Sequence, residues 1–251
     1  MIAFERCCAL LRIEPEVGYK GLDRLEKVLR KGGEAGRSRK DSWPRKGRII
    51  IKNLSIRYRP GLPYVIKDLT LRVRSGSKVG IVGRTGAGKT TLITALYRTF
   101  EEYKGQIMID GVEIRDLDLK VLRQAMTIIP QDPYLFEDSL RNNIDPMGEF
   151  SAKEIQAILK DVDLWKKFAM LDGLATKIEK EGSNLSQGEK QLVCLARALL
   201  FKKKLVLMDE ATSNIDVKTE KTIQSLIKER FVDSTVLVIA HRLNTILHCD
   251  K

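Results

Sequence analysis

The stretch KVGIVGRTGAGKTTL, residues 78–92, passes from a short apolar run through a glycine-rich turn into a helical pattern. A short, nearly all-apolar strand is typical of a parallel strand that is covered on both faces. The turn GRTGAGKT, residues 83–90, fits G-x-x-x-x-G-K-[ST] and has the strand before it and the helix after it that this motif needs. The sequence therefore predicts a phosphate-binding loop in an α/β fold.

The chemistry of this loop follows from its residue types. Glycines allow the backbone N–H groups to point inward at phosphate oxygens, and a helix starting near Gly88 adds its positive dipole end. Lys89 is placed to reach the β- and γ-phosphates, and the Thr90 hydroxyl to ligate Mg²⁺. A plain glycine-rich turn is the alternative, and the motif alone indicates only a nucleotide binder.

The flanking segments predict the rest of the fold. Residues 48–58 and 64–76 alternate apolar and polar side chains, as half-buried antiparallel strands do, and residues 105–114 predict two strands joined by an Asp110-Gly111 turn. Buried strands are predicted at residues 126–130, 204–210 and 234–241. A helix is predicted from about Val217 to Phe231, and residues from about 140 to 204 are predicted to be mostly helical, with capping boxes at Ser151–Glu154 and Ser186–Glu189.

Two adjacent carboxylates follow the strand in LVLMDEATS, residues 205–213. Ligands of open α/β sheets bind at the carboxyl ends of the strands, where the glycine-rich loop also lies. Asp209 there is predicted to help hold Mg²⁺ through its hydration shell, and Glu210 to orient and activate the water that attacks the γ-phosphate. The alternative is an exposed acidic pair at a helix start, favoured by the helix dipole.

Two further polar residues follow predicted strands. His241 ends TVLVIAH, so we expect it at the same edge in contact with the γ-phosphate, although a lone histidine is usually structural. Gln131 in IIPQDPYLF offers a neutral amide that can sense Mg²⁺ and water; the alternative is an ordinary surface-loop residue. Tyr134 and Phe136 suit a loop that docks onto a partner.

The composition is that of a soluble protein of 251 residues with a net charge of +12. Residues 1–48 hold 13 Lys or Arg against 7 Asp or Glu, and we interpret this basic, Gly- and Ser-rich segment as a solvated linker; contact with nucleic acid or with an anionic membrane surface are the alternatives. No run approaches the roughly 18 apolar residues of a membrane-spanning helix. The four cysteines lack metal-ligand spacing, which indicates free thiols in a reducing compartment, with palmitoylation of Cys7 or Cys8 as an alternative to inert thiols.

Together these pieces resemble the nucleotide-binding domain of ATP-binding-cassette (ABC) proteins, from about Arg48 to the end of the chain. The order matches: the loop from Gly83, the Gln131 loop, the signature LSQGEKQ at residues 185–191, LVLMDEATS, SNID at residues 213–216 and His241. Three segments are similar in sequence to the second such domain of subfamily C, the multidrug-resistance-protein-like exporters: GIVGRTGAGKTTL, LRNNIDPMGEFS and QLVCLARALL.

The resemblance implies a P-loop NTPase fold with a largely parallel core sheet, an N-terminal antiparallel β subdomain and an inserted helical subdomain at about residues 136–205. Residues 1–47 would join a transmembrane domain to the ATPase domain at 48–251, and the family pattern leads us to expect a further strand and helices beyond Lys251. Two such domains would close head-to-tail on ATP and Mg²⁺ at the cytoplasmic face of a membrane, so that an isolated domain hydrolyses ATP slowly or not at all.

The resemblance also assigns residues. Tyr58 would stack on adenine, Ser186 and Gly188 would face the partner's γ-phosphate, and Asp216 would communicate across the dimer. The expected catalytic residues are Lys89, Gln131, Glu210 and His241, and the expected metal-binding residues are Thr90, Gln131 and Asp209. The expected nucleotide-binding residues are Tyr58, Gly83, Arg84, Thr85, Gly86, Ala87, Gly88, Lys89, Thr90, Thr91, Ser186 and Gly188.

One residue departs from the family signature: Glu189 stands where a neutral amide is usual, and we expect neighbouring Lys190 to offset part of its charge. Two other functions compete with that of an exporter motor. One is a regulatory module that binds nucleotide and gates a channel or receptor; Glu210, a residue that hydrolysis needs, argues against it. The other is a soluble nucleic-acid-acting ATPase, suggested by the net charge, against which the exporter-like Gln131 region argues.

Overall fold

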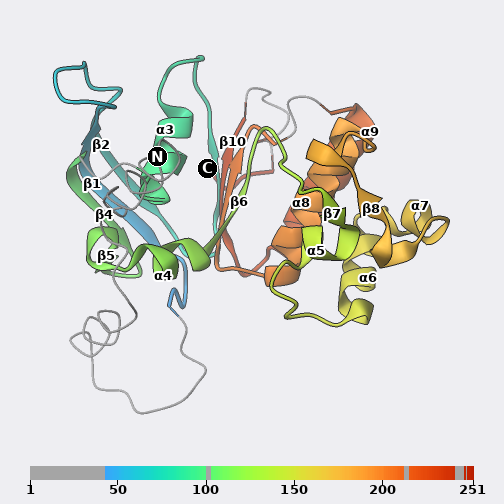
Figure 1. Cartoon of the computed structure of the whole chain (residues 1–251). Helices are drawn as coiled ribbons and strands as arrows, with labels where there is room; N and C mark the ends of the chain where they lie inside the picture. The colour runs from blue at the N-terminus through green and yellow to red at the C-terminus, as the bar shows by residue number, and fades with distance from the viewer. Residues whose placement is uncertain (1–42, 100–102, 212–214, 241–245, 247) are drawn as a thin grey trace, which may run out of the picture.

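The computed structural model describes residues 43–99, 103–211, 215–240, 246 and 248–251. Most of the predicted linker, with Cys7 and Cys8, lies outside these residues. The described chain forms layers: an antiparallel sheet on one side, a parallel sheet in the middle and a group of helices on the other side (Figure 1). The predicted α/β fold with a parallel sheet, an antiparallel sheet and a helical block is confirmed.

The antiparallel sheet has the strand order β2-β1-β4-β5. Its strands are β1 (Ile49–Ile56), β2 (Ile66–Val73), β4 (Tyr103–Ile109) and β5 (Val112–Glu113). The predicted alternation is confirmed on β1, where Ile49, Ile51, Leu54 and Ile56 are all at most 1% exposed. These residues pack over α3 (Lys89–Leu96) in one apolar cluster, so the sheet covers the helix that follows the glycine-rich loop.

The predicted turn between β4 and β5 is also confirmed. Asp110 has φ 49° and Gly111 has φ 82°, the left-handed pair that a tight hairpin needs. The Asp110 carboxylate accepts hydrogen bonds from the backbone N–H groups of Lys46, Gly47 and Arg48 at 2.8–3.0 Å. This turn therefore also fixes where the chain enters β1.

The parallel sheet has the strand order β3-β10-β9-β6. Its strands are β3 (Lys78–Ile81), β6 (Met126–Ile129), β9 (Leu205–Asp209) and β10 (Thr235–Ile239). On β9, Leu205 and Leu207 join the cluster under the antiparallel sheet, whereas Val206 and Met208 join a second cluster under the helices. Both faces of the central strands are thus covered, which explains why their sequences are apolar runs without alternation.

Strand β3 differs from the prediction that it is covered on both faces. Only Val79 among its four residues is buried, because β3 lies at the edge of the described sheet. The Gly80 N–H donates to the Lys251 carbonyl at 2.8 Å, and the Asp250 N–H to the Lys78 carbonyl at 2.7 Å. The backbone of Asp250 and Lys251 therefore satisfies two of the hydrogen-bonding groups on this edge of β3.

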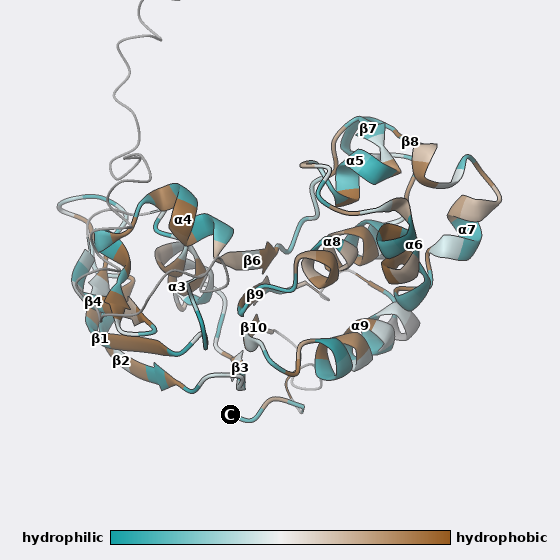
Figure 2. Ribbon diagram, turned by 90° about the horizontal axis from the view of Figure 1, so that it is seen from below, coloured by the Kyte–Doolittle hydropathy of each residue, from teal (hydrophilic) through white to brown (hydrophobic). Residues whose placement is uncertain are grey.

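Helices cover the second face of the parallel sheet and extend away from it. The α-helices beyond α3 are α4 (Leu119–Gln124), α5 (Leu140–Ile144), α6 (Ala152–Asp161), α7 (Trp165–Ala169), α8 (Gln187–Phe201) and α9 (Val217–Arg230). Short 3₁₀ turns lie at Ile114–Asp116, Gly173–Ala175 and Lys180–Gly182. Figure 2 shows apolar and polar colours alternating along α9, as expected of a helix with one covered face.

The helical block largely follows the prediction. Both capping boxes are present, at Ser151–Glu154 and Ser186–Glu189, and α9 begins at the predicted Val217. The block also contains a two-stranded sheet, β7 (Asp138–Ser139) with β8 (Lys177–Ile178), which we did not predict. Two-residue strands are too short to leave an alternating pattern in a sequence.

Gly105 on β4 provides a test of the sheet. It has φ 89°, and a Cβ there would overlap the carbonyl oxygens of Lys52 and Asn53, beside the bulge of β1. We expect Gly105→Ala to lower the free energy of unfolding by about 3 kcal/mol, because a left-handed alanine and a backbone clash add together. The control Gly61→Ala has φ 86° but open space around it, and should cost only about 1–2 kcal/mol in the same denaturant titration. Equal losses would contradict the clash.

Candidate functional site

The glycine-rich loop connects β3 to α3, with Gly88 as the N-cap of the helix at φ 83°. A Cβ on Gly88 would lie 3.2 Å from Cγ1 of both Val65 and Ile66. Only glycine therefore fits here, because it adopts the left-handed backbone conformation without strain and has no Cβ to clash with the residues at the start of β2. The predicted helix start near Gly88 is confirmed, and the dipole of α3 points its positive end into the loop.

Lys89 is drawn back into the loop. Its side chain is largely buried, and its Nζ donates to the carbonyls of Gly83 at 2.9 Å and Arg84 at 3.2 Å. The ammonium group is thereby bound by two backbone carbonyls of the loop and places its positive charge inside the loop. Beside it, the Thr90 hydroxyl donates to Asp209 Oδ1 at 3.2 Å, which joins the start of α3 to the end of β9.

A hollow of about 470 Å³ opens over this loop. Its lining comes from distant parts of the chain: Tyr58, Val65, Thr85, Gly86, Gly88, Lys89, Thr90, Thr91, Gln131 and Glu210. The volume suits a nucleotide-sized ligand. Gly83, Arg84 and Ala87 belong to the same loop without lining the hollow. The structure thus gathers most of the predicted nucleotide-binding residues at one edge of the parallel sheet.

Tyr58 lies at the rim of this hollow. The residue is 52% exposed, and its hydroxyl is 2.7 Å from Thr91 Oγ1 on α3. This contact holds the phenol end, so the ring presents a face rather than swinging freely. Val65, which also lines the hollow, was missed by sequence analysis, since a single valine near a strand start carries no signal of ligand contact.

The acidic pair lies at the end of β9. The strand ends with Asp209, as predicted, and Glu210 follows with φ 48°. The left-handed conformation of a non-glycine residue costs on the order of 1–3 kcal/mol and is concentrated at functional sites. The Glu210 N–H donates to the Ile239 carbonyl at 3.0 Å, which fixes this turn against β10. Glu210 lines the hollow together with Gln131 and Lys89.

The signature residues lie elsewhere. Ser186 caps α8 and accepts from the Glu189 N–H at 3.3 Å, and neither Ser186 nor Gly188 lines the hollow. A Cβ on Gly188 would be 3.6 Å from Asp216 Oδ2, so the signature and Asp216 share one surface. Asp216 accepts from Thr219 N and Oγ1 at the start of α9. His241, Ser213 and Asn214 fall outside the described residues.

Glu189 has a partner that sequence analysis missed. Its Oε2 accepts from the Ser186 N–H at 2.8 Å, while its Oε1 accepts from Lys167 Nζ of α7, also at 2.8 Å. Partial burial alone would raise the pKa of Glu189, but the bonds from Lys167 and Ser186 outweigh it and lower the pKa. The cation that pairs with Glu189 is thus Lys167, 22 residues upstream, rather than the neighbouring Lys190 that we expected.

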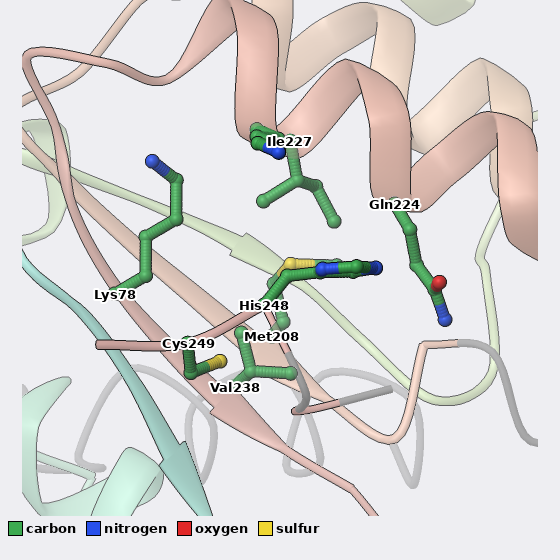
Figure 3. A pocket seen from close by; sticks show the side chains of 8 residues that line it. Lys78, Met208, Gln224, Ile227, Val238, His248 and Cys249 are labelled. Carbon is green, nitrogen blue, oxygen red and sulfur yellow. The ribbon is translucent and has the colours of Figure 1, made fainter. Parts of the chain in front are cut away.

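A second hollow lies under α9 (Figure 3). Figure 3 shows Met208, Val238 and Ile227 around it, with Lys78, Gln224, His248 and Cys249 at its border. Its volume of about 30 Å³ has room for about one water molecule. It cannot hold a nucleotide, so the hollow over the glycine-rich loop is the candidate site.

The comparisons with known proteins define the class. The family model described as "ABC transporter" matches residues 66–213. The chain therefore belongs to the ABC transporter family, whose members are ATPases and bind nucleotide. None of the helices in the described ranges combines the length and the apolar character that crossing a bilayer requires.

Particular relatives narrow the class. The chain is 48% identical over 226 residues to the pleiotropic ABC efflux transporter of multiple drugs YBT1 of Candida glabrata, covering 83% of this chain and 14% of that protein. It is 41% identical over 264 residues to the ATP-dependent bile acid permease of Saccharomyces cerevisiae, covering 95% and 16%. Human ATP-binding cassette sub-family C member 4 is 47% identical over 211 residues, covering 84% and 16%. The predicted likeness to subfamily C is confirmed, and the chain spans about one sixth of these relatives.

A solved structure agrees with the fold. "Structure of a bacterial Atm1-family ABC exporter with ATP bound" superimposes with a TM-score of 0.78 at 32% identity, covering 91% of this chain and 41% of that one. The likeness extends over both sheets and the helical block, since it covers nearly the whole chain. The predicted ATPase domain of the exporter type is thereby confirmed.

The pair between Lys167 and Glu189 predicts a pH-dependent stability. Because the folded pKa of Glu189 is lowered, its contribution is present above the ordinary value of 4.5 and is lost as the pH falls through the folded pKa. The side chains are 40% and 25% exposed, so we expect Lys167→Met to cost about 0.5–1 kcal/mol at neutral pH and almost nothing in acid. Urea titrations at several pH values measure this. Lys166→Met, at the exposed neighbouring position, is the control, and an equal, pH-independent loss in both variants would contradict the pairing.

Proposed function

We propose that this chain is the second nucleotide-binding domain of a subfamily C exporter and that its ATP hydrolysis powers transmembrane transport. The observation that carries the proposal is the convergence of Lys89, Thr90, Gln131 and Glu210 on one hollow, from the ends of the three strands β3, β6 and β9. The efflux transporters among its relatives support transport as the purpose, although the chain covers only part of each.

The donor set suits Mg²⁺ bound together with ATP. Among the described residues, no cluster of three or more His, Cys, Asp or Glu side chains is placed to hold a metal on its own. The site offers oxygen donors instead: the Thr90 hydroxyl against the Asp209 carboxylate, with the Gln131 side chain nearby. Mg²⁺ typically takes one or two carboxylates, phosphate oxygens and several waters. When bound, it would offset charge on the phosphates, with Thr90, Asp209 and Gln131 as its protein partners.

Glu210 is the proposed general base. Its carboxylate would accept a proton from water as the water oxygen bonds to the γ-phosphorus and the bond from phosphorus to the ADP oxygen breaks. The Lys89 ammonium and the loop N–H groups would hold the phosphate oxygens in place during this step. The turn at Glu210, whose backbone N–H is bonded to the end of β10, keeps this residue in the lining of the hollow. His241 is proposed to contact the γ-phosphate.

Two surfaces of the domain are the proposed contact sites for partner domains. Ser186, Gly188 and Asp216 lie away from this chain's own hollow, as a head-to-tail dimer requires if they serve the nucleotide of a partner domain. On the Gln131 loop, Tyr134 and Phe136 are 60% and 54% exposed and form an edge-to-face pair with ring centroids 5.3 Å apart. Exposed aromatic pairs of this kind are typical of docking surfaces, so we propose that they contact transmembrane domains. The domain would lie at the cytoplasmic face of the membrane.

The presence of Glu210 favours ATP hydrolysis over a purely regulatory role. The exporters among the similar proteins favour transport over a function on nucleic acid. The deciding experiment is Glu210→Gln in the full-length transporter. We expect ATP binding within about twofold of wild type and loss of at least about a hundredfold in hydrolysis at this site, because an amide cannot accept the proton. Bound azido-ATP and phosphate release measure the two quantities. Turnover at the wild-type rate would remove Glu210 as the base.

Tyr58 tests the adenine assignment. Tyr58→Ala should weaken ATP binding about tenfold, since stacking on a base is worth on the order of 1–3 kcal/mol. Tyr58→Phe keeps the ring and loses only the contact with Thr91, so its ATP affinity should stay within about threefold of wild type. Binding of inorganic triphosphate should be equal in all three proteins. An affinity for ATP that tracks the hydroxyl rather than the ring would contradict stacking.

A further inference from the structure

Helix α8 touches two functional regions with two different side chains. Its first turn carries the signature residues Ser186 and Gly188, next to Asp216. Three residues after Gly188, the Gln191 side chain reaches the loop that carries Gln131. One rigid helix of 15 residues therefore borders both the site in this chain and the surface proposed for the partner's nucleotide.

Gln191 makes an unusual buried contact. It is 2% exposed, and its Nε2 donates to the carbonyl oxygens of Pro130 at 2.8 Å and Gln131 at 3.4 Å. Its Oε1 is also buried and has no hydrogen-bond partner within the described part of the chain. A buried acceptor that makes no hydrogen bond destabilises a protein. A residue needed only for packing would be better apolar, so the amide at this position points to a role for its donor group.

The same helix holds the far end of the loop. Arg197 donates to the Tyr134 carbonyl at 3.1 Å and to Asn143 Oδ1 at 3.2 Å. Asn143 in turn accepts from the Phe136 N–H at 2.9 Å and donates to the Phe136 carbonyl at 3.0 Å. Burial lowers the pKa of Arg197. The loop from Pro130 to Phe136 is thus attached to α8 at both ends, while Gln131 lines the hollow and the side chains of Tyr134 and Phe136 remain exposed.

We propose that Gln191 is a positioning residue that locks the Gln131 loop to α8, so that a movement of Gln131 at this chain's own nucleotide also moves Ser186 and Gly188. The inference rests on the proposed function, because it assumes that Gln131 meets the nucleotide here and that the signature meets the partner's. A packed helix transmits such a displacement because its ends move together.

A mutant cycle in the full-length transporter tests whether Gln191 acts through Gln131. Gln191→Met keeps the size of the side chain and removes the donor. We expect it to lower kcat for ATP hydrolysis about tenfold, the effect of one lost hydrogen bond, with half-saturating ATP within about twofold of wild type. In a Gln131→Ala background, Gln191→Met should lower kcat less than about twofold further. Gln156→Met on α6, a half-buried glutamine outside both loops, should leave kcat unchanged in both backgrounds.

Three outcomes would overturn the proposal. One is a wild-type kcat in Gln191→Met; another is a full tenfold loss that persists in the Gln131→Ala background, which is the behaviour of a purely structural residue. The third concerns the partner site: azido-ATP labelling of the partner domain should fall in Gln191→Met, and labelling at the wild-type level would remove the transmission. Failure of the proposed function is distinct, since the unmutated transporter would then neither bind azido-ATP in this domain nor hydrolyse ATP.

Discussion

The parallel register of β3, β10 and β9 is the constraint on which the site depends. Ile239 on β10 is aligned with Ile81 on one side and with Asp209 on the other, so the three strands end at the same level. The glycine-rich loop and the acidic pair therefore emerge side by side, although they are more than a hundred residues apart in the chain. A slip of one residue would turn every side chain of a strand to the opposite face and separate Thr90 from Asp209.

Burial on two faces holds that register. Val206 and Val238 face the helical side, Leu207 and Leu237 face α3 and the antiparallel sheet, and all four are at most 5% exposed. Fully burying an aliphatic side chain contributes about 1.5–3 kcal/mol, so moving either strand would expose several such contributions at once. The position of the edge on which Glu210 and Lys89 lie is therefore set by these apolar contacts, and hydrogen bonds such as that from the Glu210 N–H to Ile239 fix the turns that follow the strands.

Helix α8 connects this edge to the surface of the domain. Its first turns contain two polar side chains with opposite roles. Glu189 is ionised, 25% exposed and paired with Lys167, whereas Gln191 is neutral and buried against the Gln131 loop. The Lys167 pair lets a signature with a carboxylate coexist with a helix N-terminus that must remain attractive to phosphate. The local charge at the signature is therefore close to balanced, even though the chain as a whole is strongly basic.

The sequence by itself determined the elements and much of the site's chemistry. The glycine-rich loop, the capping boxes at Ser151 and Ser186, the Asp110-Gly111 turn and the apolar runs of the parallel strands are local, because each depends on backbone dihedrals or on neighbours within a few positions. Tertiary structure alone decided which residues meet. The pairs Lys167 with Glu189, Gln191 with Pro130 and Tyr58 with Thr91 join residues 22, 61 and 33 positions apart, and the partial exposure of β3 follows from its place in the sheet. Such contacts leave no periodic pattern in a single sequence, since their geometry is set by the packing of whole elements.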